Sequence, residues 1–310
     1  MRPGGPGLTL WDPAGICPRS MEAARTIRPG DGLYPDSLAR IADAPASLRL
    51  RGALSAPPAR VAVVGTRAPD DYGREMARRI ASGLARARVS VVSGGALGVD
   101  AVAHLAALDA GGHTVAVLGS GVDVPTPAGH RPLFERILGA GGALLSELPD
   151  GAPAARWTFP RRNRIVSGMS DALVVVRGTG KSGALLTAEH ARVQGVPIFA
   201  VPGEVGDPLA EAPLALLRAG ARAATAAGDV LALLGIAPQP ELPLPEGEAP
   251  VGEGERALLA ALGPRPRHAD EVARAVRLPP GSALAGLLEL ELRGLCEQRP
   301  GHFFLRRAGG

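Results

Sequence analysis

The run Val61-Ala-Val-Val-Gly65 gives the first indication of the fold, because four consecutive apolar residues that end at a glycine predict a short, buried strand. Similar apolar runs follow at residues 89–92, 114–118, 143–145, 172–176 and 197–201, and helical patterns lie at residues 71–86, 99–109, 133–138 and 185–193. Short apolar strands that alternate with helices indicate a parallel sheet covered on both faces. The sequence therefore predicts an α/β fold, a Rossmann-like doubly wound and mostly parallel sheet, over residues 60–235.

The segments before and after this domain have different compositions. Residues 1–30 are rich in Pro, Gly and Arg and are predicted to be a disordered or loosely packed lead-in. Residues 31–59 are predicted to form a short segment that leads into the main domain. Residues 236–252 are rich in proline and glutamate, which favours a solvated linker.

Residues 253–307 have the pattern of a small C-terminal winged-helix domain. Three helical stretches precede two short strands around Pro300-Gly301. The third helix carries Glu289 and Glu291, with Arg293 as its cation, whereas a helix that reads a DNA groove presents more donors. We therefore favour a protein-contact role for this domain, and leave duplex DNA binding open.

Composition limits the function classes. The chain of 310 residues has a net charge of +4 and a pI near 9.8, which fits a polyanionic partner but equally an arginine-rich proteome. Cys17 and Cys296 lie near opposite ends, a usage typical of a reducing compartment. Neither a signal peptide nor a membrane span is evident, so we expect a cytoplasmic protein without membrane contact.

The strongest motif is Phe159-Pro-Arg-Arg-Asn-Arg164. It places Arg161, Arg162, Asn163 and Arg164 directly after an aromatic residue. Proteins that bind single-stranded nucleic acid combine cations along the backbone with an aromatic face for a base. The alternative is a solvated basic loop with Phe159 in the core, but the segment runs directly into apolar residues and should be held rigidly.

Two further motifs predict phosphate contacts. Gly65-Thr66-Arg67 follows the first strand of the main domain, where backbone N–H groups and an arginine can hold a phosphate. Lys181-Ser182-Gly183 contains the only lysine of the chain, just before a helix. The run from Gly178 to Ser182 resembles an NTPase phosphate loop but lacks the first glycine of that pattern, so ATP hydrolysis is not expected.

Two other patterns, one of polar residues and one of glycines, do not predict a functional site. Asp100 and His104 are four residues apart on a helix, the spacing of an acid–base pair or half a metal site, but we favour a structural role because no third ligand is evident. Gly119-Ser-Gly121 lacks the third glycine of a dinucleotide site. We expect no catalytic residue, no metal and no cofactor.

In their order and spacing, these motifs resemble the DNA processing protein A family, also called DprA or Smf. The matching runs are Val63-Val-Gly-Thr-Arg67, Ser93-Gly-Gly-Ala-Leu-Gly-Val-Asp100, Thr114-Val-Ala-Val-Leu-Gly119, Leu145-Ser-Glu147, Phe159-Pro-Arg-Arg-Asn-Arg-Ile165, Ser182-Gly-Ala-Leu-Leu-Thr-Ala188 and Ala200-Val-Pro-Gly203. The resemblance covers most of the chain, from about Tyr34 to the C-terminus.

The resemblance implies a function without catalysis. It implies a homodimer that binds and protects incoming single-stranded DNA and loads the RecA recombinase during natural transformation. The implied pocket residues, together with those that shape the pocket, are Gly65, Thr66, Arg67, Phe159, Arg161, Arg162, Asn163, Arg164, Lys181, Ser182 and Gly183.

The chain departs from the family pattern in three places. His130 follows Thr126-Pro127 where the family has Tyr-Pro and then Asn, and Arg177 replaces a glutamate, which we expect to make the pocket more basic. After Pro202-Gly203, three polar or glycine positions hold Ala210, Ala212 and Leu214. We expect that apolar segment to serve packing or self-association.

Two alternative functions remain open. The first is a nucleotide-processing hydrolase on a related Rossmann-like scaffold, although His190 stands where the catalytic glutamate is expected and Glu189 is one residue too early. The second is a transcription regulator that acts through residues 253–307.

Overall fold

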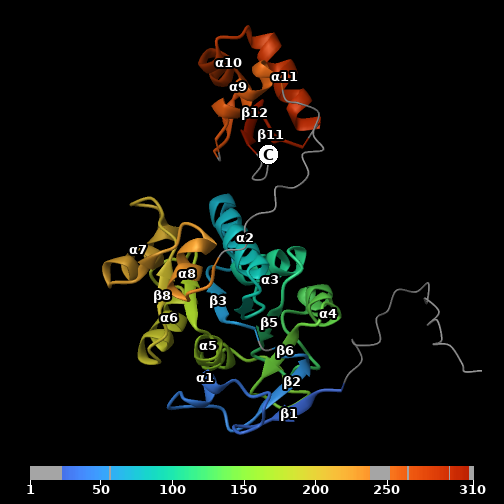
Figure 1. Ribbon diagram of the computed structural model, residues 1–310, viewed down its shortest axis with the longest axis vertical. Helices are drawn as coiled ribbons and strands as arrows, with labels where there is room; N and C mark the ends of the chain where they lie inside the picture. The colour runs from blue at the N-terminus through green and yellow to red at the C-terminus, as the bar shows by residue number, and fades with distance from the viewer. Residues whose placement is uncertain (1–22, 56, 238–251, 264, 293, 307–310) are drawn as a thin grey trace, which may run out of the picture. The chain divides into compact units, whose positions relative to one another are not determined.

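The computed structural model describes residues 23–55, 57–237, 252–263, 265–292 and 294–306, and divides between residues 239 and 240 into two compact units (Figure 1). The strands of the first unit are β1 (Arg25–Ile27), β2 (Leu48–Gly52), β3 (Arg60–Val64), β4 (Ser90–Ser93), β5 (Thr114–Val117), β6 (Ala143–Ser146), β7 (Ala172–Val175), β8 (Ile198–Ala200) and β9 (Arg222–Ala223). Its helices are α1 (Asp36–Ala39), α2 (Asp71–Arg86), α3 (Val99–Asp109), α4 (Arg131–Gly139), α5 (Thr158–Gly168), α6 (Gly183–Val193), α7 (Glu211–Arg218) and α8 (Ala227–Leu233), with 3-10 turns η2 (Ala128–His130) and η3 (Pro208–Ala210).

Within the described residues, these nine strands form one sheet in the order β1-β2-β6-β5-β4-β3-β7-β8-β9. The strands from β3 to β9 pair in parallel, while β2 pairs antiparallel with both β6 and β1. The predicted Rossmann-like, mostly parallel α/β sheet is confirmed.

Alternate side chains of each strand enter different cores. In β3, Val61 and Val63 pack with α2, α3 and α8, whereas Ala62 and Val64 face the core beneath α1, α5 and α6. Alternation of this kind follows from the two-residue period of a strand. Because both faces are apolar, the central strands read as continuous runs of valine and alanine.

The sheet extends beyond the predicted domain. From the sequence, β1 was expected within the lead-in and β2 within the segment before the domain, but both strands pair at the edge of the sheet. β2 alternates between buried leucines and partly exposed arginines, and of the three residues in β1 only Ile27 is buried. Strands this short and this polar carry little sequence signal. Residues 1–22 of the predicted lead-in at 1–30, with the cysteine at position 17, and residues 238–251 of the predicted linker at 236–252 lie outside the described residues.

The order of the strands creates a switch point beside β3. From β3 the chain winds outward through β4, β5 and β6, and it then returns to the other side of β3 to form β7, β8 and β9. Loops that leave neighbouring strands in opposite directions leave a crevice at their carboxyl ends, where ligands bind in this class of fold.

The second unit is a winged helix, as predicted. It contains α9 (Glu253–Ala261), β10 (Arg267–His268), α10 (Ala269–Val276), α11 (Pro280–Leu292), β11 (Cys296–Arg299) and β12 (Phe303–Arg306). The three strands pair in the order β10-β12-β11, and apolar residues from the helices and the sheet share one core. In the described part of the chain, no helix is both long and apolar enough to cross a membrane.

Candidate functional site

A pocket of about 500 Å³ lies at the switch point, where the loops after β3, β4 and β7 meet α5. Of the predicted site residues, it is lined by Gly65, Thr66, Arg67, Phe159, Arg162, Asn163, Ser182 and Gly183. The remaining lining residues are Val64, Gly94, Ala96, Asp100, Arg156, Pro160, Val166, Thr179, Ala184, Leu186 and Thr187. Three motifs that are far apart in the sequence therefore form one site.

Glycines allow the loops around the pocket to approach one another closely. A side chain at Gly94 would put its Cβ within 2.5 Å of the Arg162 guanidinium. Gly98 has a φ of 80°, and a Cβ there would lie 2.4 Å from the carbonyl oxygen of Thr66. Only glycine fits both constraints without strain, which explains why the loop after β4 is glycine-rich.

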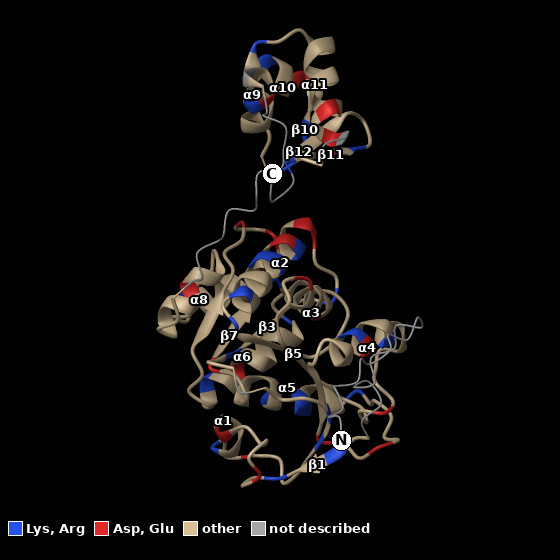
Figure 2. Ribbon diagram, turned by 45° about the vertical axis from the view of Figure 1, so that its right-hand side comes forward, with Lys and Arg blue, Asp and Glu red and all other residues tan. Residues whose placement is uncertain are grey.

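The mouth of the pocket combines an aromatic ring with positive charge. Arg67 is exposed, and its guanidinium carbon lies 5.3 Å from the centre of the Phe159 ring. The first turns of α5 and α6 contribute lining residues, and a helix N-terminus carries a partial positive charge. Figure 2 shows the basic residues of α5. This arrangement suits an anionic ligand with a flat apolar part.

Arg162 is buried in the wall of the pocket and holds it together. Its guanidinium donates hydrogen bonds to the carbonyl oxygens of Gly94 and Val117, so it connects α5 to the ends of β4 and β5. Burial lowers the pKa of Arg162; the Asp100 carboxylate opposes this effect, and the neighbouring Arg67 guanidinium adds to it. An arginine still keeps its charge at any ordinary pH.

Asp100 is the acidic residue of the lining, and its carboxylate has a structural role. It accepts hydrogen bonds from the backbone N–H groups of Gly94 at 3.1 Å and Ala96 at 3.3 Å. Burial raises the pKa of Asp100, whereas the Arg162 charge and these N–H groups lower it. Asp100 therefore shapes the glycine loop and balances part of the charge of Arg162.

His104 also has a structural role. It is fully buried, and its Nδ1 lies 2.7 Å from the hydroxyl of Thr114, which itself donates to the Val91 carbonyl. Nδ1 must therefore carry the proton. Burial, with smaller contributions from Arg162 and His130, lowers the pKa of His104 to about 3, so the ring is neutral at pH 7. Among the described residues, no cluster of three His, Cys, Asp or Glu side chains could hold a metal.

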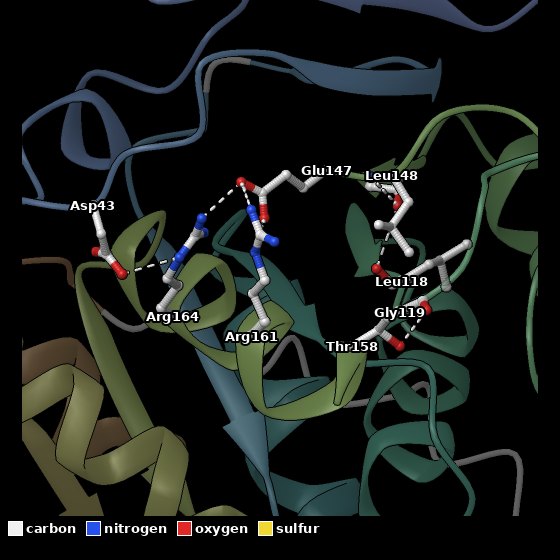
Figure 3. Close-up of polar contacts among 9 residues, drawn as sticks. Asp43, Leu118, Gly119, Glu147, Leu148, Thr158, Arg161 and Arg164 are labelled. Carbon is white, nitrogen blue, oxygen red and sulfur yellow. Dashed lines mark hydrogen bonds and ion pairs between the residues drawn. The ribbon is translucent and has the colours of Figure 1, made fainter. Parts of the chain in front are cut away.

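Two arginines of the basic motif lie outside the pocket lining. The motif forms helix α5, so its side chains point in different directions around the helix axis. Arg164 is buried and forms ion pairs with Glu147 at 2.7 Å and Asp43 at 3.0 Å (Figure 3). Arg161 is exposed and pairs with the same Glu147 at 3.1 Å. These contacts fasten α5 to the end of β6 and to the segment after α1.

Lys181 and Arg177 also lie outside the lining. Lys181 is exposed in the loop before α6, between the lining residues Thr179 and Ser182. Arg177 is 2% exposed and forms ion pairs with Asp70 and Asp207, and its guanidinium lies 5.3 Å from the centre of the Tyr72 ring. The expectation that Arg177 makes the pocket more basic is therefore wrong, because its charge is neutralised outside the pocket.

Several lining residues were not predicted from the sequence. Arg156 is an exposed cation three residues before Phe159, and residues three apart are neighbours on the surface of a helix. A helical interpretation of that segment would therefore have placed Arg156 beside Phe159 in the predicted site. Thr179 and Thr187 add hydroxyl groups on either side of the start of α6. Single threonines carry no pattern that distinguishes them in the sequence.

The apolar segment at residues 210–214, which departs from the family pattern, contributes to packing at two of its three positions. Ala210 and Ala212 are fully buried, and side chains at Gly178 or Gly203 would come within 3.2 Å of them. Leu214 is partly buried on α7.

The sequence model of the DNA recombination-mediator protein A family matches residues 25–235, and that of the DprA winged helix domain matches residues 242–302. A DprA relative from Mycobacterium tuberculosis is 43% identical over 81% of this chain, and the alignment spans 66% of the relative's length. Protein Smf of Escherichia coli is 39% identical over 89% of this chain and 76% of its own length.

Two solved structures share the fold. DNA processing protein A from Streptococcus pneumoniae has a TM-score of 0.63 and 36% identity, covering 69% of this chain and 75% of its own. DNA processing protein A from Helicobacter pylori, reported for its single-stranded DNA binding mode, has a TM-score of 0.62 and 26% identity, covering 70% and 97%. The chain therefore belongs to the DNA recombination-mediator protein A family, whose members are also named DprA and Smf.

Proposed function

We propose that this chain binds single-stranded DNA in the pocket beside β3 and acts as a recombination mediator without breaking a covalent bond. The observation that carries the proposal is the Arg67–Phe159 pair at the mouth of the pocket. A guanidinium attracts a phosphate and a phenyl ring stacks on a base, so the pair matches the two parts of one nucleotide.

The shape of the site favours a single strand over a duplex. A base that enters the pocket must first leave its neighbours, which costs a few kcal/mol in a duplex and least in a strand that is already unpaired. The lining also offers several hydroxyl and amide groups, including Asn163, Ser182 and Thr187, for the edge of a base. The described single-stranded DNA binding of the Helicobacter pylori relative supports the same ligand.

The side chains around the pocket support binding rather than hydrolysis. Asp100 already accepts two backbone hydrogen bonds, and Glu189 forms an exposed ion pair with Arg192 away from the lining. A general base must be free to accept a proton within hydrogen-bond reach of its substrate. Release of free base from nucleoside monophosphates would instead support the hydrolase alternative.

A salt titration tests the proposed ligand. The affinity for an oligo-dT should fall with a slope of about −0.7 for each phosphate contacted, and duplex DNA should bind more weakly at every salt concentration. Arg67→Glu should weaken binding at least about tenfold and reduce the slope. Lys181→Glu should have a smaller effect, because Lys181 lies beside the lining and not within it.

The matched control is Arg222→Glu. It makes the same change in net charge at the exposed strand β9, and it should bind like the parent protein. Arg162 is unsuitable for this test, because its loss would disturb the pocket wall as well as the charge. Equal affinity of the parent and Arg67→Glu proteins for oligo-dT would refute the proposal.

We further propose that the protein works in the cytoplasm as a homodimer and loads RecA on the bound strand during natural transformation. The family membership supports this role. The partly buried Leu214 on α7 supplies a test of self-association. Leu214→Glu should lower the mass measured by sedimentation, and RecA filament assembly on protein-coated DNA should be faster with the parent protein than without it.

A further inference from the structure

Trp157 is an exposed aromatic residue immediately before α5. Trp157 is 60% exposed, whereas the neighbouring Thr158 is buried and donates a hydrogen bond to the carbonyl of Gly119 (Figure 3). The Thr158 side chain therefore anchors this turn, and the Trp157 side chain is not needed to hold it in place. The preceding residue, Arg156, lines the pocket. Two consecutive residues thus present a cation inside the pocket and an indole ring outside it.

Arg161 lies on the same side of α5 as Trp157. The backbone of Trp157 is already helical, with φ −78° and ψ −19°, so a residue four positions later is its neighbour on the helix surface, with Cβ atoms roughly 6 Å apart. The side chain of Arg161 is 55% exposed. An exposed aromatic ring and an exposed guanidinium therefore stand together next to the pocket.

We infer that Trp157 and Arg161 form a second nucleotide subsite outside the pocket, in which the indole stacks on the next base of the strand and the guanidinium contacts the adjoining phosphate. This inference rests on the proposed function. The ligand follows from the chemistry of the pair, since stacking platforms combined with cations bind single strands irrespective of sequence. Arg156 lines the pocket and directly precedes Trp157, so the subsite should be occupied by the same DNA strand that enters the pocket.

The ion pair of Arg161 is compatible with this role. Its partner Glu147 also pairs with the buried Arg164 at 2.7 Å, which in turn contacts Asp43. When Arg161 turns to a phosphate, Glu147 keeps its contact with Arg164, so neither a buried charge nor the attachment of α5 is lost. Arg161 is thus the arginine of this cluster that can change partners at low cost.

Fluorescence and binding measurements on the full chain test the subsite. Trp11 is the other tryptophan of the sequence, so Trp11→Phe protein reports on Trp157 alone. Its emission should be quenched as oligo-dT binds, with the same midpoint as the affinity measurement. Trp157→Ala should weaken binding about fivefold or more, Trp157→Phe should bind within about twofold of the parent, and the salt slope should stay unchanged in both.

Two further variants complete the experiment. Arg161→Gln should reduce the magnitude of the salt slope by about 0.7, as expected for one phosphate contact. Val205→Ala truncates another exposed apolar residue, 85% exposed and outside the lining, and should behave like the parent.

The outcomes separate the subsite from the proposed function. A parent protein that does not bind oligo-dT overturns both. A parent that binds, together with an unquenched Trp157 and a Trp157→Ala protein of parental affinity, overturns the stacking role alone. An unchanged salt slope in Arg161→Gln overturns the phosphate contact.

Discussion

Two buried arginines lie at the carboxyl ends of strands of the same sheet, and their partners give them opposite roles. Arg162 is in the pocket wall and binds the neutral carbonyl oxygens of Gly94 and Val117. Arg177 follows β7 and binds the carboxylates of Asp70 and Asp207. A carbonyl satisfies a guanidinium without cancelling its charge, whereas two carboxylates cancel it. The partner, and not the arginine itself, therefore decides where positive potential remains.

The pKa shifts of the two arginines reflect the same difference. Burial lowers the pKa of Arg162, and Asp100 opposes this effect from a distance. Burial also lowers the pKa of Arg177, but the hydrogen bonds to Asp70 and Asp207 outweigh it and raise the value above normal. In return, the contact with Arg177 lowers the pKa of Asp207. Asp70 and Asp207 thus neutralise the charge of Arg177, whereas the charge of Arg162 remains available to a ligand.

Replacing Arg162 should have the largest effect. Arg162→Met leaves two carbonyl groups without their donor and Asp100 without its nearby positive charge, so the free energy of unfolding should fall by about 3–5 kcal/mol. Binding to oligo-dT should be lost as well. Urea unfolding followed by circular dichroism measures the first effect. A loss below about 1 kcal/mol would show that Arg162 does not support the wall.

Replacing Arg177 should affect stability but not binding. Arg177→Met removes a contact between the start of α2 and the turn at η3, and its two carboxylate partners remain 40% and 28% exposed, so water reduces the penalty. We expect the free energy of unfolding to fall by about 2–3 kcal/mol. Affinity for oligo-dT should stay within about twofold of the parent, and a tenfold loss would contradict the division of roles.

The stability of the fold should depend on pH through His104, because burial and the nearby charge of Arg162 lower the pKa of His104. The ordinary pKa of 6.5 applies to the unfolded chain and about 3 to the folded one, so below pH 6.5 the unfolded state binds more protons. Stability should therefore fall by about 2 kcal/mol between pH 7 and pH 5. His104→Gln, which can still donate to Thr114, should lack this contribution, as urea unfolding at both pH values will show.

Much of the fold was predictable from the sequence because the central strands are buried on both faces. The valine-rich runs at β3, β4 and β7 and the glycines after them predicted the strands and the crevice. β1 and β2 were not predicted as part of the sheet. They lie at its edge, where a few buried residues such as Ile27 and Leu50 are enough to hold a strand. Helix α5 was not predicted either, because its proline and arginines mask the apolar period.

The candidate site was predictable in its motifs and less so in its individual side chains. The arginines of the α5 motif predicted an anion-binding site, yet of Arg161, Arg162 and Arg164 it is Arg162 that lines the pocket, whereas the other two pair with Glu147 outside it. A helix turns by 100° per residue, so adjacent cations diverge, and the sequence does not state which neighbours neutralise them. Glu147, fourteen residues before Arg161, is such a neighbour, and only the contact between α5 and the residue that follows β6 reveals it.

By itself, the sequence determined the wound α/β sheet, the winged helix, the family and the three loops that meet at the pocket, because apolar periodicity and glycine position are local properties of the chain. Only the tertiary structure decided which cations remain available. Charge neutralisation depends on contacts between residues far apart in sequence, such as Arg177 with Asp70, and these contacts exist only once the sheet has brought its loops together.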